Sequence, residues 1–112
     1  LLNGNTISNY DGEGAGLTAT GCSSINGTKS VPNLSADLIG DWREEVILTC
    51  DGKLRMYTTD QLTPRRIHTL MHDPQYRMQV SSQNARYNQP PHPSFHIGAG
   101  MKEPPQPNIR VR

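Results

Sequence analysis

Apolar and polar residues alternate most clearly in the middle of the chain. Residues 45–49 contain the apolar run Val46-Ile47-Leu48 and are rich in β-branched side chains, which predicts a buried strand, whereas residues 53–58 alternate and predict a half-buried one. The dipeptide Asp51-Gly52 between them is a strong signal for a two-residue hairpin turn. Residues 34–39 add a third short strand before a turn at Gly40-Asp41. Strands joined by such tight turns predict an antiparallel meander.

The remaining segments give weaker signals. Residues 1–33 are rich in Gly, Asn, Ser and Thr and predict mainly loops, and helix and loop are both open for residues 81–89. The tail from residue 102 carries three prolines and predicts an extended or disordered segment. Further short strands are expected at residues 6–10, 66–70, 76–80 and 95–98. The fold class is therefore all-β, and its strand rhythm fits a sandwich, a barrel or blades of a propeller.

The composition predicts a thin hydrophobic core. The chain has 112 residues, enough for one small domain, but only 33% are hydrophobic and 5% aromatic, with ten Gly and nine Pro. An average domain has roughly 45–50% apolar residues when Gly is included. We therefore expect a piece of a larger protein, whose core is completed by further sequence or by a partner chain.

Charge and cysteine content exclude several function classes. The net charge is +1 and basic residues are sparse, so we expect no nucleic-acid partner, and no apolar stretch approaches the roughly 20 residues of a membrane span. Cys22 and Cys50 are not part of a C-x-x-C pair, which disfavours zinc. Because sequence gives no distance between their α-carbons, one disulfide and two free thiols both stay open.

A cluster of acidic residues precedes the buried strand. Asp37, Asp41, Glu44 and Glu45 could supply oxygens to calcium, which prefers six to eight of them. Glu44 and Glu45 are adjacent and would face opposite sides of a strand, so both cannot point at one site. The alternative is a solvated corner in which Arg43 pairs with the acids. Trp42 in the same stretch fits packing better than a sugar platform.

Other polar residues allow a functional and an ordinary interpretation. The pairs His68/His72 and His92/His96 have the spacing of metal ligands on a helix, but strand, turn and proline signals surround them, which favours surface histidines. Lys29, Arg86 and Tyr87 are residue types that bind anionic sugars, through charge, a guanidinium fork and a ring face. Without further context, each is more often an ordinary surface residue.

Four sequence blocks carry a family resemblance. They are L-S-A-D-L-I-G-D-W-R-E-E-V-I-L at 34–48, R-M-Y-T-T at 55–59, T-L-M-H-D-P at 69–74 followed by Y-R, and Q-N-A-R-Y-N-Q-P-P-H at 83–92. In this order and spacing they resemble the C-terminal part of bacterial rhamnogalacturonan lyases of polysaccharide lyase family 11. The resemblance covers about residues 26–101, is looser over the first 25, and leaves the tail unplaced.

The resemblance implies a fold and an activity. The family is an eight-bladed β-propeller that binds several calcium ions and cleaves the rhamnose–galacturonate backbone of rhamnogalacturonan I, a pectin polysaccharide. This chain would then supply antiparallel meanders of the last blades. The implied division is an N-terminal loop-rich segment at 1–25, a blade region at 26–101 and a tail at 102–112. The implied location is bacterial and secreted, on the cell surface or in the periplasm.

The resemblance also assigns site residues. Lys29 in N-G-T-K and Tyr87 in A-R-Y-N-Q are expected in the active site, with Arg86 and Asn88 binding substrate. The expected calcium ligands or supports of the cleft are Asp37, Asp41, Glu44 and Asn84. Because most blades are absent, we expect no activity from this chain alone. Two alternatives are a non-catalytic calcium-dependent polysaccharide-binding module and a β-domain that self-associates to close its sheet edges.

Overall fold

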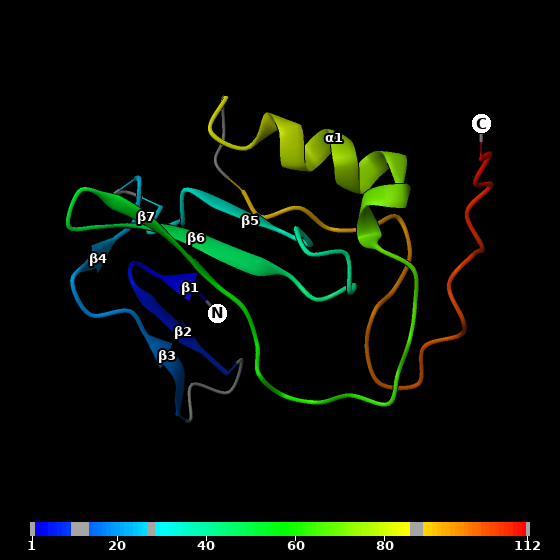
Figure 1. Cartoon of the computed structure of the whole chain (residues 1–112), viewed down its shortest axis with the longest axis horizontal. Coiled ribbons are helices and arrows are strands. Elements are labelled where there is room, and N and C mark those ends of the chain that lie inside the picture. The colour runs from blue at the N-terminus through cyan, green and yellow to red at the C-terminus, as the bar shows by residue number, and fades with distance from the viewer. Residues whose placement is uncertain (1, 10–13, 27–28, 86–88, 112) are drawn as a thin grey trace.

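The computed structural model contains two small antiparallel sheets (Figure 1). It describes residues 2–9, 14–26, 29–85 and 89–111. The first sheet has the order β1-β2-β3, and the second has β6 at its centre, with β7 along one edge and both β4 and β5 along the other. The strands are β1 (Leu2–Asn3), β2 (Thr6–Ser8), β3 (Ala15–Thr18), β4 (Cys22–Ser23), β5 (Leu34–Ala36), β6 (Glu45–Cys50) and β7 (Lys53–Tyr57).

The β6–β7 hairpin confirms the prediction from Asp51-Gly52. Both turn residues have positive φ, 50° and 74° respectively, as a type I′ turn requires. The two strands then pair in continuous register from Cys50↔Lys53 to Val46↔Tyr57. The predicted strands at 34–39, 45–49 and 53–58 are therefore present, the first of them shortened to three residues. The N-terminal region contains four short strands, more than its loop-like composition predicted.

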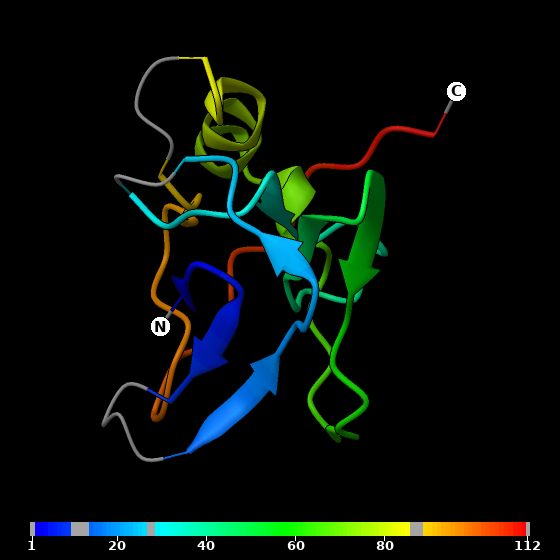
Figure 2. The ribbon, with the colours of Figure 1, turned by 90° about the vertical axis from the view of Figure 1, so that its left-hand side faces the viewer.

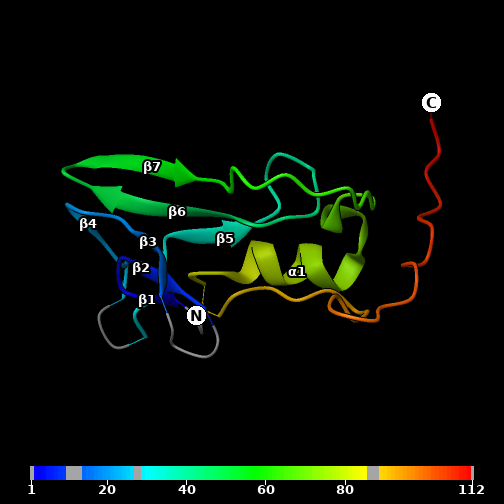
Figure 3. The same cartoon turned by 90° about the horizontal axis from the view of Figure 1, so that it is seen from below.

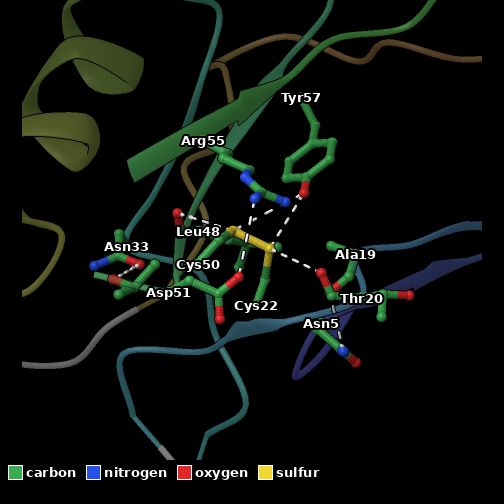
Figure 4. Close-up of a disulfide and its surroundings, with 11 residues drawn as sticks. Asn5, Ala19, Thr20, Cys22, Asn33, Leu48, Cys50, Asp51, Arg55 and Tyr57 are labelled. Carbon is green, nitrogen blue, oxygen red and sulfur yellow. Dashed lines mark hydrogen bonds and ion pairs between the residues drawn. A yellow bond between two sulfur atoms is a disulfide. The ribbon is translucent and has the colours of Figure 1, made fainter. Parts of the chain in front are cut away.

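The hydrophobic core lies between the two sheets. It consists of Ala19, Cys22, Val46, Leu48 and Cys50, with Ile7 and Tyr57 packed against it. Cys22 and Cys50 lie directly opposite each other on β4 and β6 and form a disulfide (Figure 4). The Tyr57 hydroxyl lies 3.2 Å from the Cys22 sulfur and must be the donor, because a disulfide carries no proton. Of the two alternatives left open by the sequence, the structure shows the disulfide.

The strand predicted at 76–80 is wrong, because this segment is helical. A 3₁₀ turn, η1 (Leu70–His72), leads into α1 (Pro74–Ser82). Asp73 caps α1 by accepting a hydrogen bond from the Gln75 amide at 3.1 Å, and Pro74 occupies the first turn, where its missing N–H costs nothing. Tyr76 is the one fully buried residue of α1, so the apolar alternation at 76–80 did not reflect a buried sheet face.

The predicted strands at 66–70 and 95–98 are also wrong, because both segments are irregular except for the 3₁₀ turn that begins at Leu70. Helix α1 lies beside β5, and residues 89–101 run back past it (Figure 3). The tail after residue 102 is extended and leads away from both sheets (Figure 2). Antiparallel strands dominate with little helix, so the chain is all-β in the broad sense. Neither helical element in the described residues is long and apolar enough to cross a membrane.

Candidate functional site

The loop between β5 and β6 is organised by buried carboxylates. Asp37 at its start is 1% exposed, and its Oδ2 accepts hydrogen bonds from the Thr69 hydroxyl at 2.7 Å and the Leu70 amide at 2.8 Å. These bonds tie the end of β5 to the turn that begins η1. The other oxygen, Oδ1, is buried and has no hydrogen-bond partner among the described residues. An orphaned buried carboxylate oxygen is unusual and suits a cation or an additional donor.

Glu45 is fully buried at the other end of this loop. Its Oε2 accepts hydrogen bonds from the backbone amides of Leu38 at 2.8 Å and Ile39 at 3.1 Å. Its Oε1 accepts the Thr58 hydroxyl at 3.0 Å. Glu45 therefore folds the loop back onto the β6–β7 hairpin and serves as a structural acceptor. One local signal pointed to this role, namely a glutamate at the start of an apolar strand.

Tyr76 of α1 joins the two ends of the acidic loop. Its hydroxyl donates to Glu44 Oε1 at 2.8 Å and accepts the Asp37 amide at 2.9 Å. Burial and the bond to Glu44 raise the pKa of Tyr76 well above its usual value, so the hydroxyl stays protonated. Sequence reasoning missed this residue, because a tyrosine in a polar helix gives no sign of its partner on another element.

Glu44 lies in a strongly acidic surrounding. Desolvation of its carboxylate raises its pKa, the Tyr76 hydrogen bond lowers it in part, and the charges of Asp37 and Glu45 raise it further. The residue as a whole keeps an exposed surface, although its carboxylate is crowded by Tyr76. The Tyr76 hydroxyl thus joins the backbone of Asp37 to the carboxylate of Glu44, and a cation near these acids would relieve the repulsion between their charges.

Asp41 and Asn84, the other two predicted metal ligands, are engaged elsewhere. The Arg43 amide donates to Asp41 Oδ1 at 3.1 Å, and the Arg43 guanidinium binds Oδ2 through two nitrogens. Hydrogen bonding by this arginine is the main reason that the pKa of Asp41 is lowered. Asn84 donates through Nδ2 to the Asn33 carbonyl. Within the described ranges, no three His, Cys, Asp or Glu side chains gather closely enough to hold a metal ion.

Of the four predicted active-site and substrate-binding residues, the structure describes Lys29. Lys29 is exposed in the turn that joins the bridge partners Asn26 and Val31, and its amide donates to Asn26 Oδ1 at 3.3 Å. Arg86, Tyr87 and Asn88 lie outside the described residues. The role of Lys29 and that of its three predicted neighbours therefore stay predictions.

The residues just before Arg86 are bound firmly to β5. Gln83 is buried and pairs with both backbone groups of Ser35, accepting its N–H at 3.0 Å and donating to its C=O at 2.6 Å. The next residue, Asn84, bonds to Asn33, and the side chain of Asn33 accepts the Thr49 hydroxyl at 3.1 Å. The chain leaving α1 is thereby fixed to the strand that follows the Lys29 turn.

The family of the chain follows from its similarity to known proteins. Residues 1–107 match the model of the rhamnogalacturonan lyase family 11 C-terminal domain. The chain belongs to this family. The resemblance in the four sequence blocks is confirmed, and the match extends further toward the N-terminus than those blocks do.

Close relatives are named enzymes of polysaccharide cleavage. The rhamnogalacturonan endolyase YesW of Bacillus subtilis (strain 168) is 55% identical over 95 residues, which are 83% of this chain and 15% of the relative. The rhamnogalacturonan exolyase YesX of the same organism is 54% identical over 93 residues, 81% of this chain and 15% of the relative. The chain therefore spans about 15% of the length of the curated relatives that it matches.

Solved structures show the same fold as part of longer chains. The crystal structure of rhamnogalacturonan lyase YesW superposes with a TM-score of 0.90 at 47% identity, covering 100% of this chain and 20% of that one. The Bacillus licheniformis rhamnogalacturonan lyase PL11 gives the same TM-score and identity over 99% of this chain. The described fold is thus the one that the family adopts at one end of a polysaccharide lyase.

Proposed function

We propose that this chain is the C-terminal part of an enzyme that cleaves the rhamnose–galacturonate backbone of rhamnogalacturonan I by β-elimination. The observation that supports the proposal most directly is the family match over residues 1–107, together with relatives of 54% and 55% identity that are named rhamnogalacturonan lyases. On this view the chain contributes some side chains to a substrate cleft, and the rest of a longer polypeptide contributes the others.

The chemistry defines the roles that side chains must fill. A base removes the proton α to the galacturonate carboxylate, the electron pair forms a carbon–carbon double bond, and the glycosidic oxygen leaves and takes up a proton. We assign the two proton transfers to Lys29 and Tyr87, one as base and the other as acid. Arg86 and Asn88 hold the sugar through the guanidinium fork and the side-chain amide.

Calcium is part of the same proposal. Of the four expected ligands, Asp37 and Glu44 fit a cation best, because Asp37 has an orphaned buried oxygen and the pKa of Glu44 is raised near two other carboxylates. Asp41 is held by Arg43 and Asn84 by Asn33, so their role is to shape the loops around the cleft. When bound, calcium would supply positive charge that stabilises the carbanion-like state of the galacturonate.

A titration tests the calcium assignment. Calcium added to the purified chain should release heat in isothermal titration calorimetry, and Asp37→Asn should abolish it while Asp60→Asn in an exposed connecting segment should not. Equal heats from both variants would remove Asp37 from the proposal.

The location and the larger fold are proposals as well. The Cys22–Cys50 disulfide supports secretion, a cell-surface position or the bacterial periplasm, since disulfides persist in oxidising compartments. The antiparallel meander of β5, β6 and β7 supports the last blades of an eight-bladed propeller.

The decisive experiment replaces the two proposed catalytic residues in a longer lyase that carries this chain. Lys29→Ala and Tyr87→Phe should each abolish the rise in ultraviolet absorbance caused by unsaturated galacturonate, while Lys53→Ala, an exposed lysine on β7, should leave it unchanged. If cleavage persists in both variants while binding to the polysaccharide falls, the chain is a binding module and the catalytic assignment is wrong.

A further inference from the structure

A cavity lies where the C-terminal tail passes the beginning of α1. Its volume is about 420 Å³, within the range of roughly 300–1,000 Å³ that is usual for small-ligand sites. Residues 68–77, which include η1 and the first turn of α1, form one wall, residues 94–95 form another, and the tail at 105–108 closes the third side (Figure 1). We call it the tail cavity. The side chains that matter are His68, His72, Arg77, Phe95, Gln106 and Asn108.

Three rings form the apolar part of the tail cavity. The centroid of the His68 ring lies 6.1 Å from that of Phe95, at an interplanar angle of 61°, and 6.1 Å from that of His72, at 57°. Tilted arrangements of this kind are preferred by neighbouring rings, so His68 joins two segments of the chain. All three residues are half-buried and keep part of their surface exposed. Such ring surfaces pack well against the C–H groups of a pyranose.

Arg77 brings a positive charge to the tail cavity. Its Nη1 donates to the Met71 carbonyl at 3.3 Å, and none of the ion pairs within the described ranges includes it. A guanidinium has five N–H donors in a fixed fork that matches a carboxylate. Asp73 also lines the cavity, but its two oxygens accept the backbone amides of Gln75 and Ser94. Arg77 is therefore the group best placed to receive an anionic group of a ligand.

The tail contributes side-chain amides. Gln106 and Asn108 line the cavity, and neither side chain has a hydrogen-bond partner in the part of the chain that the structure describes. Each amide offers two donors and an acceptor, as sugar hydroxyls require. Pro105 and Pro107 fix φ on both sides of Gln106, so less backbone freedom is lost when a ligand binds. Rings, one cation and amides together match a sugar that carries a carboxylate better than a simple anion or an apolar molecule.

We infer that the tail cavity binds a uronate, a pyranose ring that carries a carboxylate. The carboxylate binds the Arg77 guanidinium, and the C–H face of the ring packs against His68 and Phe95. The hydroxyls reach the amides of Gln106 and Asn108. The choice of a uronate among anionic sugars rests on the proposed function, because galacturonate is the anionic sugar of the proposed substrate.

The tail cavity is a second place, away from the proposed catalytic turn. Lys29 lies on the segment that leads into β5, and Gln83 at the end of α1 binds that strand. The cavity lies at the beginning of α1 instead. A helix of nine residues is about 13 Å long, so a single sugar ring does not span the two places. Binding in the cavity therefore holds the polysaccharide without taking part in the elimination.

Titration of the purified chain with D-galacturonate, followed by nuclear magnetic resonance, tests the inference. Signals of His72, Phe95 and Arg77 should shift and saturate. D-galactose, which lacks the carboxylate, and acetate, which lacks the ring, should each bind at least about ten-fold more weakly. Arg77→Gln keeps a side-chain donor but loses the charge, and should weaken galacturonate binding by a similar factor. Arg55→Ala, at an exposed position on β7, is the control and should leave the affinity unchanged.

Several results would overturn the inference. They are the absence of saturating shifts at these residues, an equal affinity for D-galactose or acetate, and an equal affinity of Arg77→Gln and the natural chain. If Lys29→Ala removes the shifts and Arg77→Gln does not, the sugar binds at the proposed catalytic turn, so this inference fails while the proposed function stands. If Arg77→Gln alone loses binding while a longer lyase with Lys29→Ala still cleaves, the cavity is supported and the catalytic assignment of Lys29 fails.

The same titration distinguishes two sources of the uronate. A homogalacturonan oligosaccharide presents uronates in succession, whereas a rhamnogalacturonan oligosaccharide presents them in alternation with rhamnose. Saturating shifts of Phe95 and Arg77 with either one support the site, and the tighter of the two identifies the backbone that it binds. Saturation with the monosaccharide and with neither oligosaccharide would overturn a role in holding the polysaccharide.

Discussion

At the scale of single residues, the acidic loop depends on buried polar groups that satisfy one another. Tyr76, Asp37 and Glu45 are almost completely buried, and together they accept or donate seven of the hydrogen bonds described above. The sequence pointed to the acids because of their density. It could not distinguish Glu45, which binds backbone amides, from Asp37, which keeps a free oxygen, because that difference depends on the geometry of the loop.

Removing the Tyr76 hydroxyl should destabilise the fold. Tyr76→Phe deletes the donor to Glu44 and leaves the Asp37 amide without its acceptor in a buried position, so we expect a loss of about 1–3 kcal/mol in the free energy of unfolding. Urea denaturation measures this loss. Tyr57→Phe is the control and should cost less, because the hydrogen bonds of its hydroxyl within the described residues go to the disulfide sulfurs, which are weak acceptors. Equal losses would mean that the Tyr76 bonds contribute little.

Glu44 should make stability depend on pH. Its pKa is raised in the folded state, so the protonated form is favoured by folding, and this contribution is present below the ordinary pKa of about 4.3 and lost as the pH rises through the folded pKa. With a chelator present, Glu44→Gln should therefore gain stability relative to the natural chain between about pH 4 and pH 7. Thermal denaturation across this range measures the effect, and Glu103→Gln in the exposed tail is the control. Parallel curves for the natural chain and Glu44→Gln would contradict the prediction.

At the scale of elements, the architecture rests on a hairpin, a disulfide and a helix that is attached by its side chains. The hairpin was predictable, because the Asp51-Gly52 turn and the flanking alternation are local signals. Helix α1 was not, since its sequence shows no apolar stripe. It is held by hydrogen bonds between Tyr76 and Asp37, just after β5, and between its C-cap residue Gln83 and Ser35 of β5. The Asp73-Pro74 pair was the local signal available, and it indicates a helix start as well as a turn.

The two hydrogen bonds between Gln83 and the backbone of Ser35, called the Gln83 clamp here, should be essential to the docking of α1 on β5. Gln83→Ala would leave both the N–H and the C=O of the buried Ser35 unpaired, so we expect a loss of about 2–4 kcal/mol. Gln83→Glu keeps the acceptor but sets a carboxylate oxygen against the Ser35 carbonyl oxygen, so it should cost at least as much as Gln83→Ala. Chemical denaturation measures all three, with Gln106→Ala in the exposed tail as the control. A natural-like midpoint for Gln83→Ala would show that water replaces the clamp.

The disulfide should contribute substantially to stability. It joins residues 28 apart, and in the loop-entropy model closing such a loop stabilises the folded state by about 3.5 kcal/mol. Reduction of the natural chain should lower the free energy of unfolding by about this amount, measured by guanidinium denaturation. The variant Cys22→Ser with Cys50→Ser should show the same lower value with and without reductant. A reductant-insensitive natural chain would contradict this.

At the scale of the whole molecule, the sequence predicted class and family better than details. The thin core expected from the composition is present, a small cluster between two sheets, and the four sequence blocks led to the family that residues 1–107 match. The strands at 66–70 and 95–98 were wrong because short apolar segments have no local feature that separates strand from irregular structure. The strand at 76–80 was wrong because Asp73-Pro74 begins a helix there. The division at residues 25 and 101 stays a prediction.

The chain alone should not cleave its proposed substrate. It spans about 15% of the curated lyases, so a cleft built from many segments would be incomplete. Purified chain mixed with rhamnogalacturonan I should give no rise in ultraviolet absorbance under conditions where the B. subtilis endolyase gives a clear one. Appreciable turnover would show that the groups needed for elimination all lie within these 112 residues.

The position of the disulfide has a consequence for the peptide that contains Lys29. Lys29 lies between Cys22 and Cys50, inside the covalent ring that the disulfide closes. A protease that cuts the backbone on either side of this lysine therefore opens the ring without releasing a fragment. The nicked chain loses no residues and gains only the water that hydrolysis adds, and its two sheets stay tethered. The disulfide thus allows the proposed catalytic turn to be broken while the surrounding scaffold remains one molecule.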